Sequence, residues 1–89
     1  MQITFNEAKD VLNKSKHGVS LSEAEKLEWD DALIWQDTRR DYGEVRMIAL
    51  GTIGVRLYCA VYVDREETRR IISLRKANNQ EKKLYVSNN

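Results

Sequence analysis

The spacing of hydrophobic positions changes about a third of the way along the chain, from a helical period to a strand period. Residues 7–16 repeat apolar positions at the i, i+3, i+4 spacing of an amphipathic helix. Asn6 precedes this run as a helix cap, and Gly18 follows it where a left-handed residue ends a helix without strain. A second helix is predicted to start after Ser20, because Ser20 and Glu23 have the spacing of a capping box.

From residue 33 onward the pattern is typical of strands joined by short connections. Four strands are predicted, at Leu33–Thr38, Glu44–Ile53, Val55–Val63 and Arg69–Lys76. Asn78 and Glu81 then form the cap and third position of a short last helix. Helices and strands that are segregated along the chain indicate an α+β protein. We expect two N-terminal helices, an antiparallel sheet of about four strands and a short C-terminal helix.

The length and composition limit the kind of protein this can be. A chain of 89 residues has the size of one domain, here residues 1–89, and leaves little room for a deep cavity, so an open surface site is expected. Cys59 is the single cysteine and lies in an apolar run, which predicts a core residue in a reducing compartment. The start does not resemble a signal peptide, and no run reaches the ~20 apolar residues of a membrane span. The expected location is the cytoplasm, with no membrane partner.

Charge is distributed unevenly although the net charge is only +1. Residues 1–43 contain six Lys/Arg and nine Asp/Glu, a balance of −3, whereas residues 44–89 contain nine and five, a balance of +4. A polyanionic partner would therefore contact the second half. An ordinary solvated surface explains the same split.

Arginines inside the predicted strands are the most informative polar residues. Glu44 and Arg46 point to the same face as Ile48 by the two-residue period of a strand. In the last strand this period predicts one face with Arg69, Ile71, Ser73 and Arg75, and an opposite face with Arg70, Ile72, Leu74 and Lys76. Guanidinium groups held on strands bind phosphate bidentately and stabilise charge at a phosphoryl centre. Exposed strand charges with cross-strand ion pairs are the alternative explanation.

Few other side chains carry chemistry. His17 is a general acid or base near neutral pH, or a cation that satisfies the end of the first helix. Tyr85 follows the basic strand, so its hydroxyl is expected to approach a site. Trp29 and Trp35 can stack on bases, but packing explains them better. The sequence has neither a Cys/His cluster with zinc spacing nor a Gly-rich phosphate loop, so we expect no metal and no cofactor.

Several motifs taken together resemble the BrnT family of toxins. They are Lys16-His17-Gly18-Val19-Ser20, Glu44-Val45-Arg46 with Gly51, Arg70-Ile71-Ile72-Ser73-Leu74-Arg75-Lys76-Ala77, and Glu81 with Tyr85. The match follows the family's order over nearly the whole chain. It departs at Phe5-Asn6-Glu7, where the family has Trp-Asp-Pro, and at Asp41-Tyr42-Gly43, where it often has a His-Ser pair before the glutamate.

This resemblance implies a RelE-like fold and a metal-independent ribonuclease that arrests translation. It also implies a BrnA-like antitoxin with a ribbon-helix-helix part. The toxin would contact DNA only indirectly, through the complex with this antitoxin. Toxins of the wider RelE group use the RNA's own 2′-hydroxyl as the nucleophile, so the protein positions a phosphate, moves a proton and stabilises the pentavalent state.

Two hypotheses follow for function. In the first, the chain is an RNA endonuclease in which Arg46 and Arg75 bind phosphate and Glu44 transfers a proton or orients an arginine. Arg70 and Lys76 would be weaker phosphate contacts, and Tyr85 and His17 accessory catalytic groups. In the second, the chain is a non-catalytic binding module whose basic sheet face docks an acidic protein segment or RNA.

Overall fold

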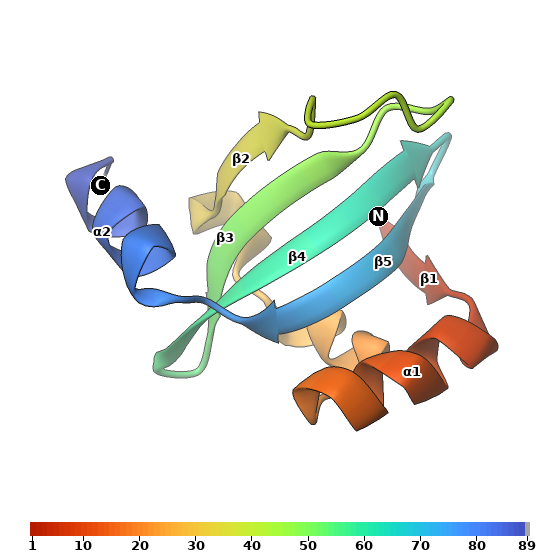
Figure 1. The fold of residues 1–89 in the computed structure, drawn as a ribbon, viewed down its shortest axis with the longest axis horizontal. Helices are drawn as coiled ribbons and strands as arrows, with labels where there is room; N and C mark the ends of the chain where they lie inside the picture. The colour runs from red at the N-terminus through yellow and green to blue at the C-terminus, as the bar shows by residue number, and fades with distance from the viewer. Residues whose placement is uncertain (89) are drawn as a thin grey trace.

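The computed structural model describes residues 1–88 (Figure 1). The strands are Gln2–Phe5 (β1), Leu33–Gln36 (β2), Met47–Ile53 (β3), Arg56–Arg65 (β4) and Thr68–Lys76 (β5). The helices are Glu7–His17 (α1) and Asn79–Ser87 (α2), and two 3-10 helices lie at Leu21–Lys26 (η1) and Trp29–Asp31 (η2). Within the described range, each helix is too short or too polar to cross a membrane.

The five strands form one mixed sheet in the order β1-β5-β4-β3-β2. Strands β2 to β5 pair antiparallel, as predicted, whereas β1 pairs parallel with β5. The α+β class is confirmed. The expectation of an antiparallel sheet of about four strands is incomplete, because it lacks the parallel edge strand β1. β1 gives little sequence signal because it has four residues, of which only Ile3 and Phe5 alternate toward the core.

Helix α1 is confirmed, with both of its predicted ends. The Asn6 side chain accepts a hydrogen bond from the Lys9 N–H at 3.1 Å, and Gly18 adopts φ 74° at the C-terminal end. Helix α2 is also confirmed, because Asn78 and Glu81 form the reciprocal capping box.

The predicted second helix is instead the pair of 3-10 helices. The Ser20 hydroxyl accepts from the Ser22 N–H at 3.2 Å, and the Asp10 carboxylate of α1 accepts from the Leu21 N–H at 2.7 Å, so the expected capping box does not form. The buried positions Leu21, Ala24 and Leu27 recur every three residues, which matches the three residues per turn of a 3-10 helix.

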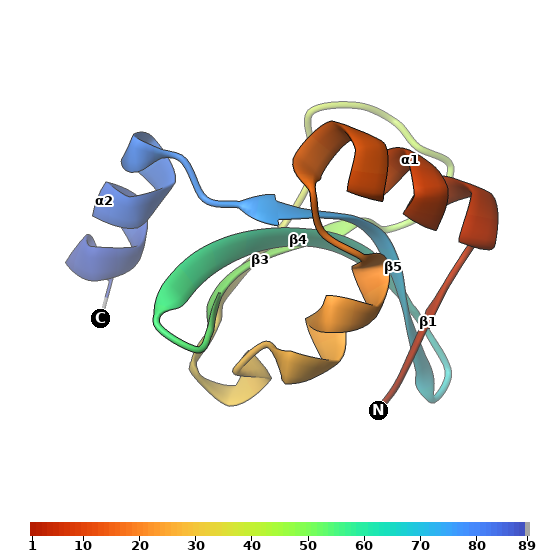
Figure 2. The same cartoon turned by 90° about the horizontal axis from the view of Figure 1, so that it is seen from below.

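The main core lies between the sheet and the 3-10 helices. Figure 2 shows η1 and η2 on one side of the sheet, which we call the covered face, and α1 beside β5. The side chains buried there include Leu21, Ala24 and Leu27 against Ala60, Tyr62 and Leu74. The opposite side, the open face, carries a smaller cluster of Ile48, Leu50, Leu57 and Cys59. Cys59 is a buried free thiol, as predicted, and burial raises its pKa to about 11.

A β-bulge in β5 overturns the predicted division of its side chains. Val61 pairs with Ser73 but Tyr62 pairs with Ile71, so Ile72 is an extra residue in the ladder. Ile71 and Leu74 consequently both face the covered side. The pairing with β4 places Arg70, Ser73 and Arg75 together on the open face. Arg69 and Lys76 lie on the covered side, where the Arg69 guanidinium stacks on Trp29 at 4.5 Å.

Several strand ends also differ from the prediction. β2 stops at Gln36 rather than Thr38, and β3 begins at Met47, so that Glu44 lies in the loop before it. β4 continues to Arg65, which shortens the predicted loop to the tight turn at Glu66 and Glu67. Pairing across the hairpin extends the regular strand beyond its apolar residues.

Candidate functional site

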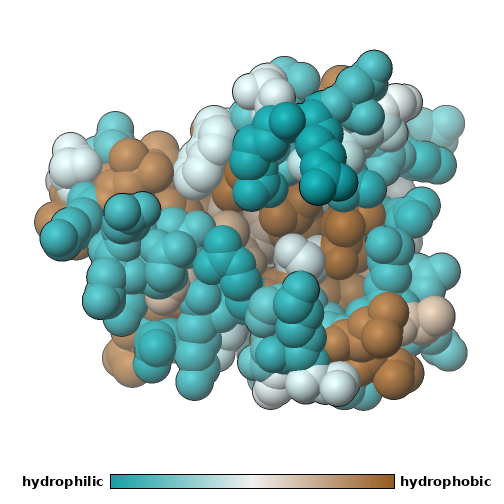
Figure 3. All heavy atoms as spheres, viewed as in Figure 1, coloured by the Kyte–Doolittle hydropathy of each residue, from teal (hydrophilic) through white to brown (hydrophobic). Residues whose placement is uncertain are grey.

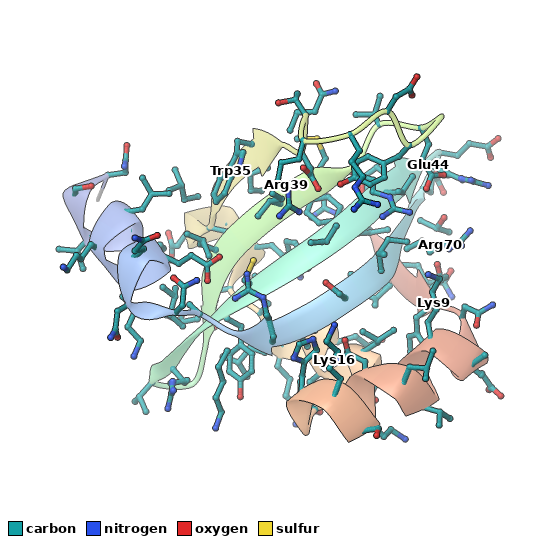
Figure 4. All side chains as sticks on the ribbon, viewed as in Figure 1. Lys9, Lys16, Trp35, Arg39, Glu44 and Arg70 are labelled. Atoms are coloured by element: carbon teal, nitrogen blue, oxygen red, sulfur yellow. The ribbon has the colours of Figure 1, made fainter. Side chains whose placement is uncertain are left out.

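The open face is bounded on three sides by elements that carry charged side chains. α1 lies along β5, the loop of residues 37–46 lies along the opposite side, and α2 lies at one end (Figure 1). In the space-filling view, apolar side chains lie in a hollow between hydrophilic side chains on both sides (Figure 3). The labelled side chains of Lys9, Lys16, Arg39, Glu44 and Arg70 lie around this hollow (Figure 4).

Arg46 and Glu44 form the centre of one charged cluster. Arg46 Nε lies 3.5 Å from Glu44 Oε2, and the guanidinium stacks on the Tyr42 ring at 4.2 Å. Arg65 Nη2 donates to the other oxygen of Glu44 at 3.1 Å. Arg46 Nε is buried without a hydrogen-bond partner in the described residues. Glu44 therefore lies between two arginines, and one of them keeps an unused buried donor.

Asp37 fixes a further arginine at the rim of the same cluster. Its carboxylate is buried and accepts two hydrogen bonds from the Arg39 guanidinium, each at 2.8 Å, and one from the Tyr42 hydroxyl at 3.0 Å. These donors, Arg39 first, hold the pKa of Asp37 well below its usual value. Arg39 itself remains 72% exposed. The pairing therefore orients a cation that still reaches solvent.

Arg75 forms a second cluster toward α2. Its guanidinium donates to both oxygens of Glu81 at 2.8 Å, in a bidentate ion pair. This pairing lowers the pKa of Glu81, while burial opposes that shift. Glu81 also caps α2, so a single carboxylate ties the orientation of Arg75 to the position of the helix. Arg75 keeps 35% of its side chain exposed toward the open face.

His17 ends α1 beside this second cluster. Burial lowers its pKa first, and the positive charges of Lys16 and Arg75 lower it further. The neutral imidazole is favoured, and a neutral imidazole can accept a proton. His17 also lines a cavity of about 170 Å³ between α1 and β5.

The structure brings only some of the predicted site residues together. Arg75 lies opposite Cys59, and Arg70 lies opposite Val63, four residues further along β4, or about 13 Å. Arg46 precedes Met47, which pairs with Tyr62, so Arg46 lies at the level of Val63 on the other side of β4. The predicted residues therefore form an Arg46–Glu44 group near Arg70 and a separate Arg75–His17 group.

Lys76 lies on the opposite face of the sheet from both groups, and Tyr85 lies on α2, one helical turn after Glu81. Lys76 is exposed at the end of β5 and is paired with Tyr58 on the covered side. The Tyr85 hydroxyl donates to the Asp31 carbonyl at 3.4 Å, and its ring packs beside Leu57 near the β3–β4 hairpin. The hydroxyl of Tyr85 thus connects α2 to η2.

Sequence reasoning missed Asp37, Arg39 and the contact of Glu81 with Arg75. The Asp-x-Arg spacing at 37–39 is a usable signal, because a short loop can fold an arginine back onto a carboxylate two residues earlier. Glu81 was expected only as a cap. Among residues 1–88, no three or more His, Cys, Asp or Glu side chains are grouped so that they could hold a metal ion.

These features define a small α+β protein whose open sheet face presents guanidinium groups that carboxylates orient. The family model for "Ribonuclease toxin, BrnT, of type II toxin-antitoxin system" matches residues 5–81. The chain therefore belongs to the BrnT family, the ribonuclease toxins of type II toxin–antitoxin systems.

A solved structure supports the same assignment. The fold is similar to the crystal structure of the Brucella abortus ribonuclease toxin BrnT, with a TM-score of 0.70 and 25% identity. The match covers 89% of this chain and 99% of that chain. No curated protein sequence matches this chain. Of the two hypotheses, family membership selects the endoribonuclease.

Proposed function

We propose that this toxin cleaves RNA without a metal ion, on its open sheet face, and thereby arrests translation. The observation that carries this proposal is the set of guanidinium groups that carboxylates orient on that face, above all Arg46 with Glu44 and Arg75 with Glu81. Oriented cations bind the RNA phosphates and stabilise the charge that develops at phosphorus.

The proposed reaction needs no nucleophile from the protein. The 2′-hydroxyl oxygen attacks the adjacent phosphorus and gives up its proton, the bond from phosphorus to the 5′-oxygen breaks, and that oxygen takes up a proton. Glu44 is the candidate that accepts the proton or orients Arg46, with which it pairs. His17 is the corresponding candidate beside Arg75, because its lowered pKa favours the proton-accepting form. Arg70 would bind a neighbouring phosphate.

Lys76 and Tyr85 stay predicted site residues, one as a phosphate contact and one as an accessory catalytic group. The partner that neutralises the toxin is proposed to be a BrnA-like ribbon-helix-helix antitoxin, which would supply the only contact with DNA. The relation of the fold to RelE-like toxins and a cytoplasmic location belong to the same proposal.

Alanine at Arg46 or Arg75 tests this assignment. We expect Arg46→Ala and Arg75→Ala each to lower the rate of RNA cleavage by about 10²-fold or more, because each removes a donor to the transition state. Purified protein is mixed with RNA with and without EDTA, and growth is followed after induced expression. Arg40→Ala, which removes an exposed loop charge that has no ion-pair partner among residues 1–88, is the control and should remain active. Full cleavage by both variants would contradict the site, and cleavage that EDTA abolishes would contradict the mechanism.

A further inference from the structure

A groove between α1 and β5 differs from the rest of the open face in its charge. Lys9, Lys16 and His17 line one wall, and Ile72 and Ser73 line the other. None of the lining side chains is a carboxylate. The carboxylate of Asp10, on the same helix, is used on another side, where it binds the Leu21 N–H and pairs with Lys14. The groove is therefore a locally positive channel.

The cations beside this groove are available to a ligand. Carboxylates already pair with Arg39, Arg46, Arg65 and Arg75 elsewhere on the open face. Lys9, Lys16 and Arg70 have no ion-pair partner among residues 1–88. A phosphate that approaches these three residues does not have to displace a carboxylate. Their Coulomb attraction to a polyanion is correspondingly larger than that of the paired arginines.

The two walls of the groove are fixed relative to one another. The buried Asn13 side chain donates to the Leu74 carbonyl at 2.8 Å and accepts from the Leu74 N–H at 3.2 Å. This amide binds the edge of β5 at the point where β1 has ended, because β1 pairs only as far as Ile71. The bulge at Ile72 places Arg70 and Ser73 on the open side. The groove is thus formed before any ligand binds, which lowers the cost of ordering the site.

We propose that this groove binds the backbone of single-stranded RNA beside the cleavage site, with Lys9 and Lys16 on two phosphates of one strand that are about three nucleotides apart and Ser73 as a hydrogen-bond donor. The proposal rests on the ribonuclease function and extends its site. Lys9 and Lys16 are seven residues apart on one helix, or about 10.5 Å. That distance corresponds to roughly three nucleotides of a stacked strand. The same groove leads toward His17 and Arg75, so the strand would continue into the second arginine cluster.

RNA fits this groove better than a protein partner does. Its apolar lining is limited to Leu12 and Ile72, whereas the centre of a protein interface needs larger buried apolar or aromatic anchors. Lysines act as point charges on long flexible stems and so suit phosphates whose position varies along a strand.

A charge-matched pair of double variants tests the groove. The probe is a 2′-O-methyl oligoribonucleotide of about ten residues, which lacks the nucleophile and is not cleaved. We expect Lys9→Ala/Lys16→Ala to raise its Kd on the order of tenfold and to reduce the slope of log K against log salt by about 1.4. The control Lys82→Ala/Lys83→Ala removes the same charge from α2, and its Kd should stay within about twofold of the unchanged chain.

The outcomes separate this inference from the function itself. If the unchanged chain binds RNA and both double variants bind it equally well, the groove is not a subsite although the function stands. If both pairs weaken binding equally, net charge alone is responsible, and the inference fails. If the unchanged chain neither binds nor cuts RNA, both proposals fail. If the Lys9/Lys16 change weakens only the binding of the antitoxin, the groove is a protein site.

His17 provides a second readout because it is the single histidine of the chain. A phosphate in the groove lies near the imidazole and offsets the positive charges that lower its pKa. NMR titration of His17 should therefore show a higher pKa with saturating 2′-O-methyl RNA than without it. The difference should shrink in Lys9→Ala/Lys16→Ala and persist in Lys82→Ala/Lys83→Ala. An unchanged pKa at saturation would place the RNA elsewhere.

Discussion

Asn13 shows how a single polar residue can replace part of a strand. Its amide donates to the Val19 carbonyl at 2.9 Å and exchanges two hydrogen bonds with the backbone of Leu74. Leu74 is fully buried, so its N–H and carbonyl have no access to water. The side chain therefore satisfies backbone groups that an adjacent strand would otherwise pair.

Asn13→Ala is expected to lower the free energy of unfolding by about 2–4 kcal/mol, because it leaves buried backbone groups unpaired. For a domain of this size the loss corresponds to a fall in Tm of roughly 10–25 °C. Urea and thermal unfolding measure both quantities. Leu12→Ala, at a neighbouring helix position with 68% exposure, should change stability by less than about 0.5 kcal/mol. Equal losses in the two variants would contradict the proposed role of the amide.

At the scale of elements, structures with local signals were predictable and structures set by distant contacts were not. Asn6 and Asn78 directly precede α1 and α2 as their N-caps, and both helices were predicted from these local signals. The bulge at Ile72 depends on the register between β5 and β4, and the sequence of β5 alone does not predict this register. It decides that Arg70, and not Arg69, shares a face with Arg75. Arg46, Arg70 and Arg75 were therefore predicted from sequence as candidate site residues, but their grouping was not.

Gly51 allows the linker between η1 and η2 to approach β3 closely. A Cβ atom at this position would lie 2.6 Å from Leu27 Cδ2 and 3.3 Å from the Ala32 Cβ atom. Leu27 is buried in the main core and has little room to move. Gly51→Ala should therefore cost about 1–3 kcal/mol of stability through overpacking.

A double-mutant cycle tests this explanation of Gly51. If contact with Leu27 is the cause, Gly51→Ala should cost clearly less when Leu27 is already alanine, with a coupling of about 1 kcal/mol in urea unfolding. Thr52→Ala, at the next position of β3, is the control for the effect of alanine in this strand. Additive losses from Gly51→Ala and Leu27→Ala would show that the contact does not limit the packing.

For the molecule as a whole, four groups have lowered pKa values, and each of them makes the folded state less stable as the pH falls. Hydrogen bonds from Leu21, Arg39 and Arg75 lower the pKa values of Asp10, Asp37 and Glu81 respectively. Burial lowers the pKa of His17. Each of these groups binds its proton more tightly in the unfolded chain than in the folded one. The free energy of unfolding therefore falls as pH falls.

Stability should accordingly be highest between about pH 7 and pH 8.5. As the pH drops below the ordinary 6.5 of histidine, His17 contributes the first loss, and the carboxylates contribute a larger one below about pH 4.5. On the alkaline side, burial holds the Cys59 pKa at about 11 against an ordinary value of 9.0. The folded state keeps this thiol protonated while the unfolded chain loses the proton, so stability declines from about pH 9 toward pH 11.

Urea unfolding from pH 3 to pH 10.5 measures this profile, and three variants assign its parts. His17→Gln should flatten the segment between pH 5 and pH 7, since glutamine does not titrate in this range. Asp37→Asn should reduce the slope of the acid segment, to which Asp10 and Glu81 still contribute, and should lower stability at pH 7 by about 1–2 kcal/mol. Arg39 and Tyr42 lose a charged acceptor, but Arg39 remains largely solvated. Cys59→Ala should flatten the alkaline segment. If His17→Gln keeps the slope that the unchanged chain shows from pH 5 to pH 7, other groups cause that slope. His17 would then be a weaker reporter of ligand binding in the groove.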